Sequence, residues 1–327
     1  MIITRTPLRM SFFGGGTDFP EYSKQFRGIT ISTTIDKYIY VYLRKLPQYF
    51  EYQNEVVYRI IERTSCRLDE IKHPLIREAM KLKNLNNIHL VYDSDLPART
   101  GLGTSSCFAV GMLNAFNALN GQYANKEQIA IEAIKLERDL CNEVGGMQDQ
   151  IASAYGGFNK IEYNGRDFIV SPLILSTERK STLEKNILMF YTKTVRFSSD
   201  VQKSCNRTDK NVLDKLHKIK NIALEAEKIL TNKQMSIDLF GELLDWSWQL
   251  KKQTSPAISN SQIDYYYQAA KKAGAIGGKL LGAGSGGFLI FYVKPEYQNS
   301  VRKALSQLIE VEFKFDNSGT RIIYYDE

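Results

Sequence analysis

The sequence has few of the residues on which thiol, zinc and histidine chemistry depend. Its 327 residues include four cysteines and three histidines. The two cysteines nearest to each other, Cys107 and Cys141, are 141 − 107 = 34 positions apart, which excludes a CxxC redox motif and the paired spacing of a thiolate zinc site. Three scattered histidines argue against a histidine-rich metal site or a Ser-His-Asp arrangement. We expect the cysteines to be reduced and structural.

Long apolar segments and runs of charge are also missing. No apolar run approaches the length of about 20 residues that spans a bilayer, and residues 1–7 lack the basic segment and apolar core of a secretory signal. Lysine and arginine exceed aspartate and glutamate by 43 − 36 = 7, but they are dispersed, unlike the basic run of a nucleic-acid-binding arm. We therefore predict a cytoplasmic protein that binds neither membrane nor nucleic acid. The excess charge indicates either small anionic ligands or a solvated basic surface.

Length and residue pattern predict two domains of mixed helix and sheet. A chain of 327 residues exceeds the size at which a single core usually stops growing. Its 43% hydrophobic and 24% charged residues are typical of a folded globular protein. Strand and helix patterns are interleaved without a regular βαβ alternation, which indicates an α+β fold rather than a doubly wound one. The polar stretch 176–185 predicts a linker, and we place the domains at residues 1–178 and 179–327.

Hydrophobic periodicity and turn residues locate the individual elements. The predicted strands cover residues 2–13, two segments within 28–43, 88–93, 158–163, 167–175, 186–192, 288–293, 311–316 and 320–325. The predicted helices cover residues 74–83, 104–120, 126–142, 211–231, 235–252, 261–273 and 296–309. A further short helix is expected to start just after the turn at Gly145-Gly146.

A loop rich in glycine and hydroxyl groups at residues 96–106 leads directly into the helix predicted from residue 104. Gly101 and Gly103 allow backbone conformations that other residues avoid, and they let the chain approach a ligand closely. The first N–H groups of the helix lack partners within it, so they can bind an anion such as phosphate. Ser105 and Ser106 can cap the helix or reach a phosphate-bound metal. The loop alone leaves two interpretations open, a phosphate-binding loop and an ordinary capped helix.

Two further glycine-rich segments, at residues 13–18 and 282–287, lie far from this loop in the sequence. The second of them contains a GxGxxG pattern, but the next six residues predict a strand, whereas a dinucleotide-binding fingerprint opens a helix. A Walker A loop is excluded as well, because Lys279 is followed by Leu280 instead of serine or threonine. Any phosphate chemistry must therefore use another scaffold.

The three glycine-rich segments resemble the three sequence motifs of the GHMP small-molecule kinases, a family named for galactokinase, homoserine kinase, mevalonate kinase and phosphomevalonate kinase. The first motif corresponds to residues 6–18, the second to 97–106 and the third to 279–287, so the resemblance spans nearly the whole chain. Within the family, the triple glycine of the first motif and the segments 35–38 and 145–150 are most similar to bacterial D-glycero-D-manno-heptose 7-phosphate kinases and their fucokinase-like relatives.

The resemblance implies two α+β domains, an N-terminal one like ribosomal protein S5 and a C-terminal ferredoxin-like one, with ATP and the acceptor bound in the cleft between them. It also implies that the second motif and its helix hold the triphosphate, and that the third motif braces the active site. The residues so assigned to ATP are Pro97, Gly101, Leu102, Gly103, Thr104, Ser105 and Ser106, and those of the third-motif loop are Gly282, Gly284, Ser285 and Gly286.

Two residues are similar in position to the family's catalytic pair. Asp149 matches the catalytic aspartate, which in phosphoryl transfer orients the acceptor hydroxyl and accepts its proton. Arg9 matches the basic residue that the family places nearby, where a guanidinium keeps the carboxylate ionised and offsets charge on the transferring group. Taken without the resemblance, Asp149 is also consistent with a helix cap, and Arg9 with a surface charge at the end of a strand.

Glu137 is a candidate metal ligand. It lies four residues after Ala133, so helical periodicity places it with small apolar residues rather than on a solvated face, and an inward carboxylate needs a partner. The family carries a metal-binding glutamate in this region. The resemblance therefore implies that Glu137 and Ser105 hold Mg²⁺ together with phosphate oxygens, the ligands this hard cation prefers. The spacing to Asp149 is one residue longer than in mevalonate kinase, so Glu143 or an indirect role for Glu137 stays open.

The acceptor site is implied by the first motif. Asp18 resembles the family residue that hydrogen-bonds sugar hydroxyls, and Gly15 and Gly16 stand where galactokinase-like members have acidic and histidine residues. That difference leaves room for a bulkier or differently held sugar. The residues assigned to the acceptor are Gly15, Gly16, Thr17 and Asp18, with Thr194, Arg196 and Ser198 as candidates for the distal phosphate of a sugar phosphate. The last three are equally consistent with an ordinary strand-to-helix cap.

The resemblance thus predicts an ATP- and Mg²⁺-dependent sugar kinase. Its expected acceptor is the anomeric hydroxyl of D-glycero-D-manno-heptose 7-phosphate, which gives the 1,7-bisphosphate for activated-heptose synthesis. Two alternatives stay open: another sugar 1-kinase, such as a fucokinase-like enzyme, and a ligand-binding regulator that has lost turnover. The presence of Asp149, Arg9 and Glu137 together argues against the regulator. The sequence leaves open whether the chain forms a homo-oligomer.

Overall fold

A computed structural model describes residues 1–194 and 198–326 of the chain, whose strands form two sheets. The strands of the larger sheet are β1 (Ile2–Phe13), β2 (Gly28–Lys45), β3 (Asn54–Val57), β4 (Ile61–Thr64), β5 (Ile88–Ser94), β6 (Asn159–Asn164), β7 (Asp167–Pro172), β12 (Phe315–Asp316) and β13 (Arg321–Tyr325). The strands of the smaller sheet are β8 (Ile187–Tyr191), β9 (Gly277–Leu280), β10 (Phe288–Tyr292) and β11 (Ile309–Glu310), in the order β11-β8-β10-β9.

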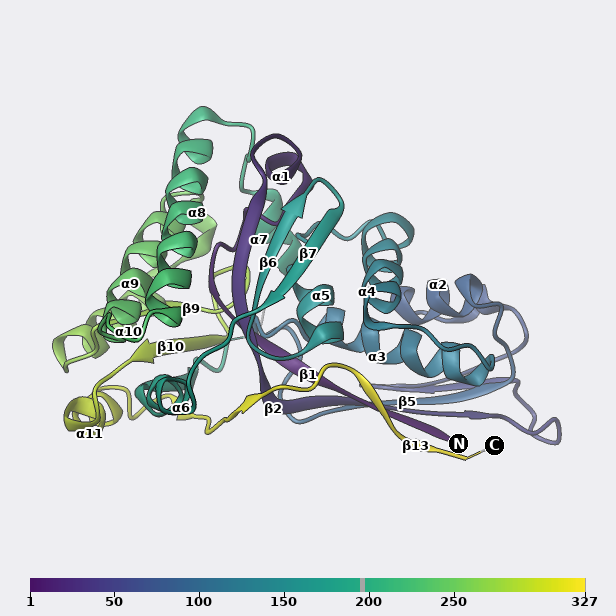
Figure 1. The fold of residues 1–327 in the computed structure, drawn as a ribbon. Coiled ribbons are helices and arrows are strands. Elements are labelled where there is room, and N and C mark those ends of the chain that lie inside the picture. Colours follow the sequence, from purple (N-terminus) through teal and green to yellow (C-terminus); the bar gives the residue numbers. More distant parts are fainter. Residues whose placement is uncertain (195–197, 327) are drawn as a thin grey trace.

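Helices cover both sheets, which confirms the predicted α+β fold (Figure 1). The helices of the first half are α1 (Pro20–Phe26), α2 (Pro74–Leu82), α3 (Thr104–Leu119), α4 (Lys126–Ile134) and α5 (Gln148–Tyr155), with the 3₁₀ turn η1 (Leu68–Glu70) and the π-helix η2 (Lys135–Leu140). Those of the second half are α6 (Thr177–Asn186), α7 (Ser198–Lys203), α8 (Lys210–Thr231), α9 (Leu239–Lys252), α10 (Ser261–Lys272) and α11 (Pro295–Ala304), with the 3₁₀ turn η3 (Pro256–Ile258). None of the helices described is long and apolar enough to cross a membrane.

The strand β2 is continuous, so the prediction of two separate strands within residues 28–43 is wrong. Its first part pairs with β6 and its second part with β5, while β1 pairs with it along both. The polar residues at positions 36 and 37 suggested a break. Asp36 is instead held by Lys314, whose backbone N–H donates to the Asp36 carboxylate at 2.8 Å and whose carbonyl accepts from the Asp36 N–H at 2.9 Å. Pairing with a distant segment therefore keeps this polar stretch extended.

The predicted linker at residues 176–185 is also wrong, because α6 occupies it. Ser176 caps the helix by accepting a hydrogen bond from the N–H of Arg179 at 3.3 Å. The Arg179 side chain then donates to the backbone carbonyls of Leu230 and Met235 at 3.1 and 2.9 Å. Polar residues of this segment thus cap α6 and form hydrogen bonds at and just after the end of α8.

Other element boundaries also differ from the prediction. The π-helix η2 continues α4, α11 ends at Ala304, and the strand expected at 311–316 is reduced to β12.

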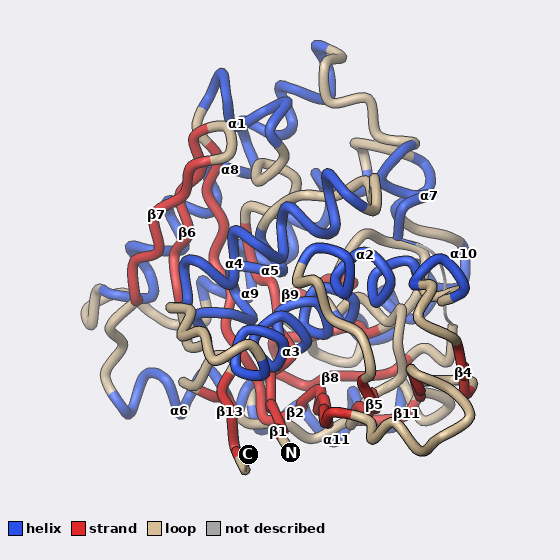
Figure 2. The backbone as a smooth tube through the Cα atoms, turned by 90° about the vertical axis from the view of Figure 1, so that its right-hand side faces the viewer, coloured by secondary structure: helices blue, strands red, loops and turns tan. Residues whose placement is uncertain are grey.

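The two ends of the chain meet on the larger sheet. Its strands run in the order β13-β1-β2-β5-β3-β4, and Ile2 of β1 pairs with Tyr325 of β13. Figures 1 and 2 show the N- and C-termini side by side. The last strands therefore return to the sheet that the first strands began. We propose that residues 1–178 form the first domain and residues 179–327 the second. The C-terminal strands β12 and β13 would then belong to the second domain in sequence but pair with the sheet of the first.

A buried core runs from the larger sheet into the helices of the second half. Phe12 and Phe13 at the end of β1 contact Phe240 of α9 edge to face, with ring centroids 5.1 and 5.0 Å apart. Helix α3 lies against β1, where Thr4 Oγ1 donates to the Gly111 carbonyl at 2.9 Å. A Cβ at Gly111 would lie 2.7 Å from Thr6 Oγ1, so the glycine permits this close approach. The packing fixes β1 and α3, the two elements on which the site is built.

Candidate active site

A pocket of about 1030 Å³ is lined by residues from both halves of the chain. The first half contributes the loop after β1, the start of α3, the side of η2 and the start of α5, and the second half contributes residues from α7 to α8 and the segment 279–283. Single ligands commonly occupy pockets of about 300–1000 Å³. The volume therefore has room for a nucleotide and a second small molecule.

The N-terminal end of α3 lies in this pocket. Gly103 precedes the helix in a left-handed conformation with φ of 75°, and a Cβ there would lie 3.3 Å from Asp149 Oδ2. Glycine at position 103 therefore lets the helix end approach the aspartate. The residues assigned to ATP that line the pocket are Gly101, Gly103, Thr104, Ser105 and Ser106. Pro97 is exposed and Leu102 is fully buried, and among the described residues neither belongs to the lining.

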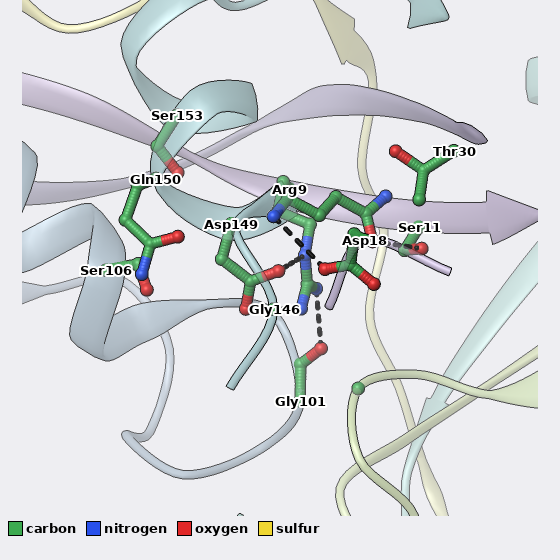
Figure 3. Close-up of polar contacts among 12 residues, drawn as sticks. Arg9, Ser11, Asp18, Thr30, Gly101, Ser106, Gly146, Asp149, Gln150 and Ser153 are labelled. Carbon is green, nitrogen blue, oxygen red and sulfur yellow. Dashed lines mark hydrogen bonds and ion pairs between the residues drawn. The ribbon is translucent and has the colours of Figure 1, made fainter. Parts of the chain in front are cut away.

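Arg9 and Asp149 form a two-point ion pair beside that helix end (Figure 3). The Nε and Nη2 of Arg9 donate to Oδ1 and Oδ2 of Asp149, each at 2.8 Å, and Nη1 donates to the Gly101 carbonyl at 2.7 Å. Arg9 is 3% exposed, whereas the Asp149 side chain is 30% exposed. The arginine thus fixes a carboxylate that still faces the pocket, and it ties that carboxylate to the glycine loop.

Glu137 lies under the first turn of α3 and is 2% exposed. Ser105 Oγ donates to its Oε1 at 2.8 Å, Ser106 Oγ donates to its Oε2 at 2.6 Å, and Gln150 Nε2 also donates to Oε2. Within the described residues its hydrogen-bond donors are neutral, and it forms no ion pair with a lysine or arginine. The π-helix η2 carries it, a distortion found frequently at functional sites. Glu143, the alternative, is exposed near the rim of the pocket.

The loop after β1 brings Asp18 to the pocket. Its Oδ1 accepts from the Gly16 N–H at 2.9 Å and its Oδ2 from the Gln148 N–H at 3.2 Å. Burial raises the pKa of Asp18, with a further contribution from the charge of Asp149, while the backbone hydrogen bonds oppose the shift. Gly15 and Gly16 line the pocket with it. Within the described structure Thr17 does not line the pocket. It is fully buried, and its hydroxyl donates to the Gly14 carbonyl at 2.8 Å.

The third-motif loop packs on the second-motif loop. A Cβ at Gly282 would lie 2.5 Å from Gly101 Cα, so the backbones touch. Ser285 is held away from the pocket, where its N–H donates to the Ile258 carbonyl at 2.7 Å. Gly284 and Gly286 turn the chain with φ of 127° and 159°. The third-motif loop therefore supports the second-motif loop. Of the residues assigned to the third-motif loop, Gly282 lines the pocket in the described structure.

Of the three candidates for a distal phosphate, the structure describes the side chain of Thr194 alone. Thr194 lies against Gly286 and donates from Oγ1 to the Thr192 carbonyl at 3.3 Å. Arg196 lies outside the described residues. The backbone of Ser198 begins α7, and nothing in the described residues places its side chain.

Two lysines that sequence reasoning missed lie near Arg9. Lys279 is 3% exposed and donates from Nζ to the Phe12 carbonyl at 2.7 Å, and Lys251 Nζ donates to the Gly282 carbonyl at 2.6 Å. Burial lowers the pKa of Lys279, and the charges of Lys251 and Arg9 lower it further. Both lysines line the pocket. Lys279 follows a glycine pair and begins the third motif. This position could have identified it from the sequence as a residue of the site.

An aromatic cluster forms another part of the pocket wall. Tyr58 and His73 meet edge to face with ring centroids 4.9 Å apart, and Tyr92 meets Phe108 in the same manner at 4.8 Å. Burial lowers the pKa of His73, which favours the neutral imidazole. These four residues come from separate elements and loops, so no local sequence pattern predicts that they form a cluster. A flat, apolar wall beside a helix N-terminus suits a nucleotide base.

The chain is similar to known proteins along nearly its whole length. The model for the GHMP kinases N terminal domain matches residues 65–157, and that for the GHMP kinases C terminal matches residues 226–310. A D-glycero-alpha-D-manno-heptose 7-phosphate kinase from Campylobacter jejuni is 31% identical, covering 98% of both chains. The bifunctional fucokinase/GDP-fucose pyrophosphorylase of Arabidopsis thaliana is 25% identical over 95% of this chain, which spans 32% of that protein. Among solved structures, a D-glycero-D-manno-heptose 1-phosphate kinase from Bacteroides thetaiotaomicron matches the fold with a TM-score of 0.81 at 24% identity over 100% of both chains.

Proposed function

Because the chain belongs to the GHMP kinase family and is an ATP-dependent sugar kinase, we propose that it phosphorylates the anomeric hydroxyl of D-glycero-D-manno-heptose 7-phosphate. The observation that carries this proposal is the position of Asp149, which Arg9 clamps at the N-terminus of α3 in the pocket that also contains Asp18. The likeness to the Campylobacter jejuni heptose 7-phosphate kinase along the whole chain supports the choice of acceptor.

The chain's own residues suffice for placing both substrates. The free N–H groups at the start of α3 bind the phosphates of ATP, and the aromatic cluster of Tyr58, His73, Tyr92 and Phe108 holds the adenine. Asp18 binds sugar hydroxyls. Asp149 orients the anomeric hydroxyl and takes its proton as the oxygen attacks the γ-phosphorus and the bond to the β-phosphate oxygen breaks. Arg9 holds the Asp149 carboxylate in place and offsets negative charge as it develops.

The residues around Glu137 fit a magnesium ion. A buried carboxylate with only neutral donors has its charge uncompensated, and Ser105 adds a hydroxyl oxygen at the helix end where phosphates bind. Magnesium is usually held by one or two carboxylates and substrate phosphates. We therefore propose Glu137 and Ser105 as its protein ligands. When bound, the ion supplies positive charge that neutralises the phosphate oxygens during transfer.

Substituting Glu137→Gln should raise the Mg²⁺ concentration for half-maximal rate by at least about tenfold. The amide preserves an acceptor for the serine hydroxyls but loses the negative charge that attracts the ion. Steady-state rates at fixed ATP over a series of free Mg²⁺ concentrations measure the effect. The matched control is Glu143→Gln on the exposed rim, which should behave as wild type. If Glu143→Gln shows the shift and Glu137→Gln does not, the metal assignment belongs to Glu143.

A panel of sugars tests the acceptor. With MgATP, the 7-phosphorylated heptose should give a kcat/KM far above those for unphosphorylated heptose, fucose and galactose, because the phosphate of the acceptor adds charged hydrogen bonds of about 1.5–3 kcal/mol each. The product should carry its new phosphate on the anomeric oxygen, which ³¹P and ¹³C NMR can locate. Fucose is included because of the likeness to the Arabidopsis thaliana fucokinase. Equal or better use of fucose would replace the heptose assignment with a fucokinase-like one.

A further inference from the structure

A partly buried arginine of the second half of the chain, Arg207, lines the pocket together with Asp18 and Phe19. Its guanidinium carbon lies 3.4 Å from the centre of the Phe19 ring, which it covers. Its Nη1 donates to the backbone carbonyls of Gln202 and Cys205 at 3.2 and 3.3 Å. Its Nε is buried and has no hydrogen-bond partner among the described residues. The side chain is thus held in place by stacking and by carbonyls, with donor capacity left over.

The charge of Arg207 has no direct counterpart in the described structure. Arg9, by contrast, is neutralised by Asp149 at 2.8 Å, and no carboxylate lies within ion-pair distance of Arg207 among the residues described. Burial lowers the pKa of Arg207, and the more distant Asp18 and Glu21 offset this in part. A guanidinium taken out of water without an anion costs free energy. An anionic ligand in the pocket would remove that cost.

The position of Arg207 relative to Asp18 defines where such an anion would lie. Asp18 Oδ2 accepts a hydrogen bond from the N–H of Gln148, the residue before Asp149, at 3.2 Å. Phe19, which Arg207 covers, is the next residue after Asp18. The wall of the pocket therefore presents Asp149, then Asp18, then Arg207. An acceptor with its reacting hydroxyl at Asp149 and other hydroxyls at Asp18 would extend its far end towards Arg207.

Three other cations that line the pocket, Arg138, Lys251 and Lys279, have their own partners or lie at the reacting end. Arg138 uses its guanidinium on the backbone carbonyls of Glu143 and Gly146, at 3.3 Å from Nη1 and 2.7 Å from Nη2, so it shapes that loop. Lys251 and Lys279 lie near Arg9, at the reacting end. Arg207 lies beside Phe19 at the acceptor end, and its remaining N–H groups suit a phosphate, which arginine recognises through paired hydrogen bonds.

We propose that Arg207 binds the distal phosphoryl group of the acceptor and thereby selects sugar phosphates over unphosphorylated sugars. This inference rests on the proposed function and names the residue that sets its substrate class. It is an alternative to Thr194, Arg196 and Ser198, the residues that the sequence suggested for the distal phosphate. Arg207 acts on binding and not on the transferring group, so its loss should change KM for the phosphorylated acceptor rather than the chemistry at Asp149.

The test compares wild type with Arg207→Gln, which retains part of the stem over Phe19 but carries no charge. The matched control is Lys210→Gln, an exposed cation three residues further along. Acceptors are D-glycero-D-manno-heptose with and without the 7-phosphate. In Arg207→Gln, kcat/KM for the 7-phosphate should fall about 10- to 150-fold, mainly through KM. The kcat/KM for the unphosphorylated heptose and the KM for ATP should stay near wild type. Lys210→Gln should change none of these values.

The outcomes separate this inference from the proposed function. If wild type prefers the 7-phosphate and Arg207→Gln preserves that preference, Arg207 is not the phosphate-binding residue. An equal loss for both heptoses would also overturn the inference, because it shows a general structural role. If wild type itself shows no preference, the proposed function fails and the inference fails with it. If Arg207→Gln does not fold, Arg207→Lys is the deciding variant, because lysine keeps the positive charge but cannot donate two parallel hydrogen bonds to a phosphate. Arg207→Lys should lose part of the preference for the 7-phosphate while its KM for ATP stays normal, and an unchanged preference would overturn the inference.

Discussion

Replacing Asp149 with asparagine is expected to lower kcat by at least about a hundredfold, the low end of what a positioned acid–base group contributes. The amide cannot take the acceptor proton, and its NH₂ group would face the Arg9 guanidinium that now donates to both carboxylate oxygens. The acceptor hydroxyl would lose both its orientation and its proton acceptor. The chain should still fold, because the Asp149 side chain is 30% exposed and belongs to the pocket surface rather than the core.

The measurement is a single-turnover assay with saturating sugar phosphate, together with ATP binding by titration calorimetry. Asp139→Asn is the matched control, since Asp139 pairs with Arg166 at 2.6 Å on the surface and does not line the pocket among the described residues. That variant should turn over at the wild-type rate. Near-normal turnover by Asp149→Asn would remove Asp149 from its proposed role.

Replacing Arg9 with methionine should lower kcat by about a hundred- to a thousandfold, the range seen when one preorganised charge-stabilising donor is removed. Three side-chain hydrogen bonds would be lost at once, two to Asp149 and one to the Gly101 carbonyl. The carboxylate would be free to rotate, and the glycine loop before α3 would keep its backbone hydrogen bond from the Arg9 N–H to the Leu102 carbonyl but lose its side-chain contact with β1. Because Arg9 is 3% exposed, the free energy of unfolding should fall as well.

Arg9→Lys separates charge from geometry. A lysine keeps the positive charge but cannot donate to both carboxylate oxygens and the loop carbonyl in the same planar arrangement, so it should recover part of the kcat. Arg63→Met serves as the control, because Arg63 forms an exposed ion pair with Glu55 at 2.8 Å. Wild-type kcat in Arg9→Met, with chemistry shown to be rate-limiting, would contradict the proposed role of Arg9.

The parts of the site that lie within one motif were predictable from the sequence. The loop at 96–106 was expected to end at a helix with free N–H groups, and Gly103 does precede α3 in a left-handed conformation. Local rules sufficed, because turn residues and apolar periodicity act over a few positions. The contact between Arg9 and Asp149, which are 140 residues apart, could be predicted only from the family resemblance. Neither residue has a local sequence feature that identifies the other as its partner.

The parts that depend on distant packing were not predictable. Arg207 lies in a polar segment before α8, and its side chain is positioned over Phe19, which is far away in the sequence. Thr17 was assigned to the acceptor by its neighbours, but its hydroxyl is turned towards the Gly14 carbonyl behind the loop. The extended course of Asp36 likewise depends on Lys314. In each case a contact between remote segments decided the outcome, and single-sequence patterns do not encode such contacts.

A crystal structure with Mg²⁺ and a non-hydrolysable ATP analogue would test the central assignment most directly. We expect phosphate oxygens within hydrogen-bonding distance of the backbone N–H groups of residues 103–106, with the terminal phosphate facing Asp149 and adenine against Tyr58 and Phe108. Triphosphate density elsewhere in the pocket, or a terminal phosphate turned away from Asp149, would contradict it.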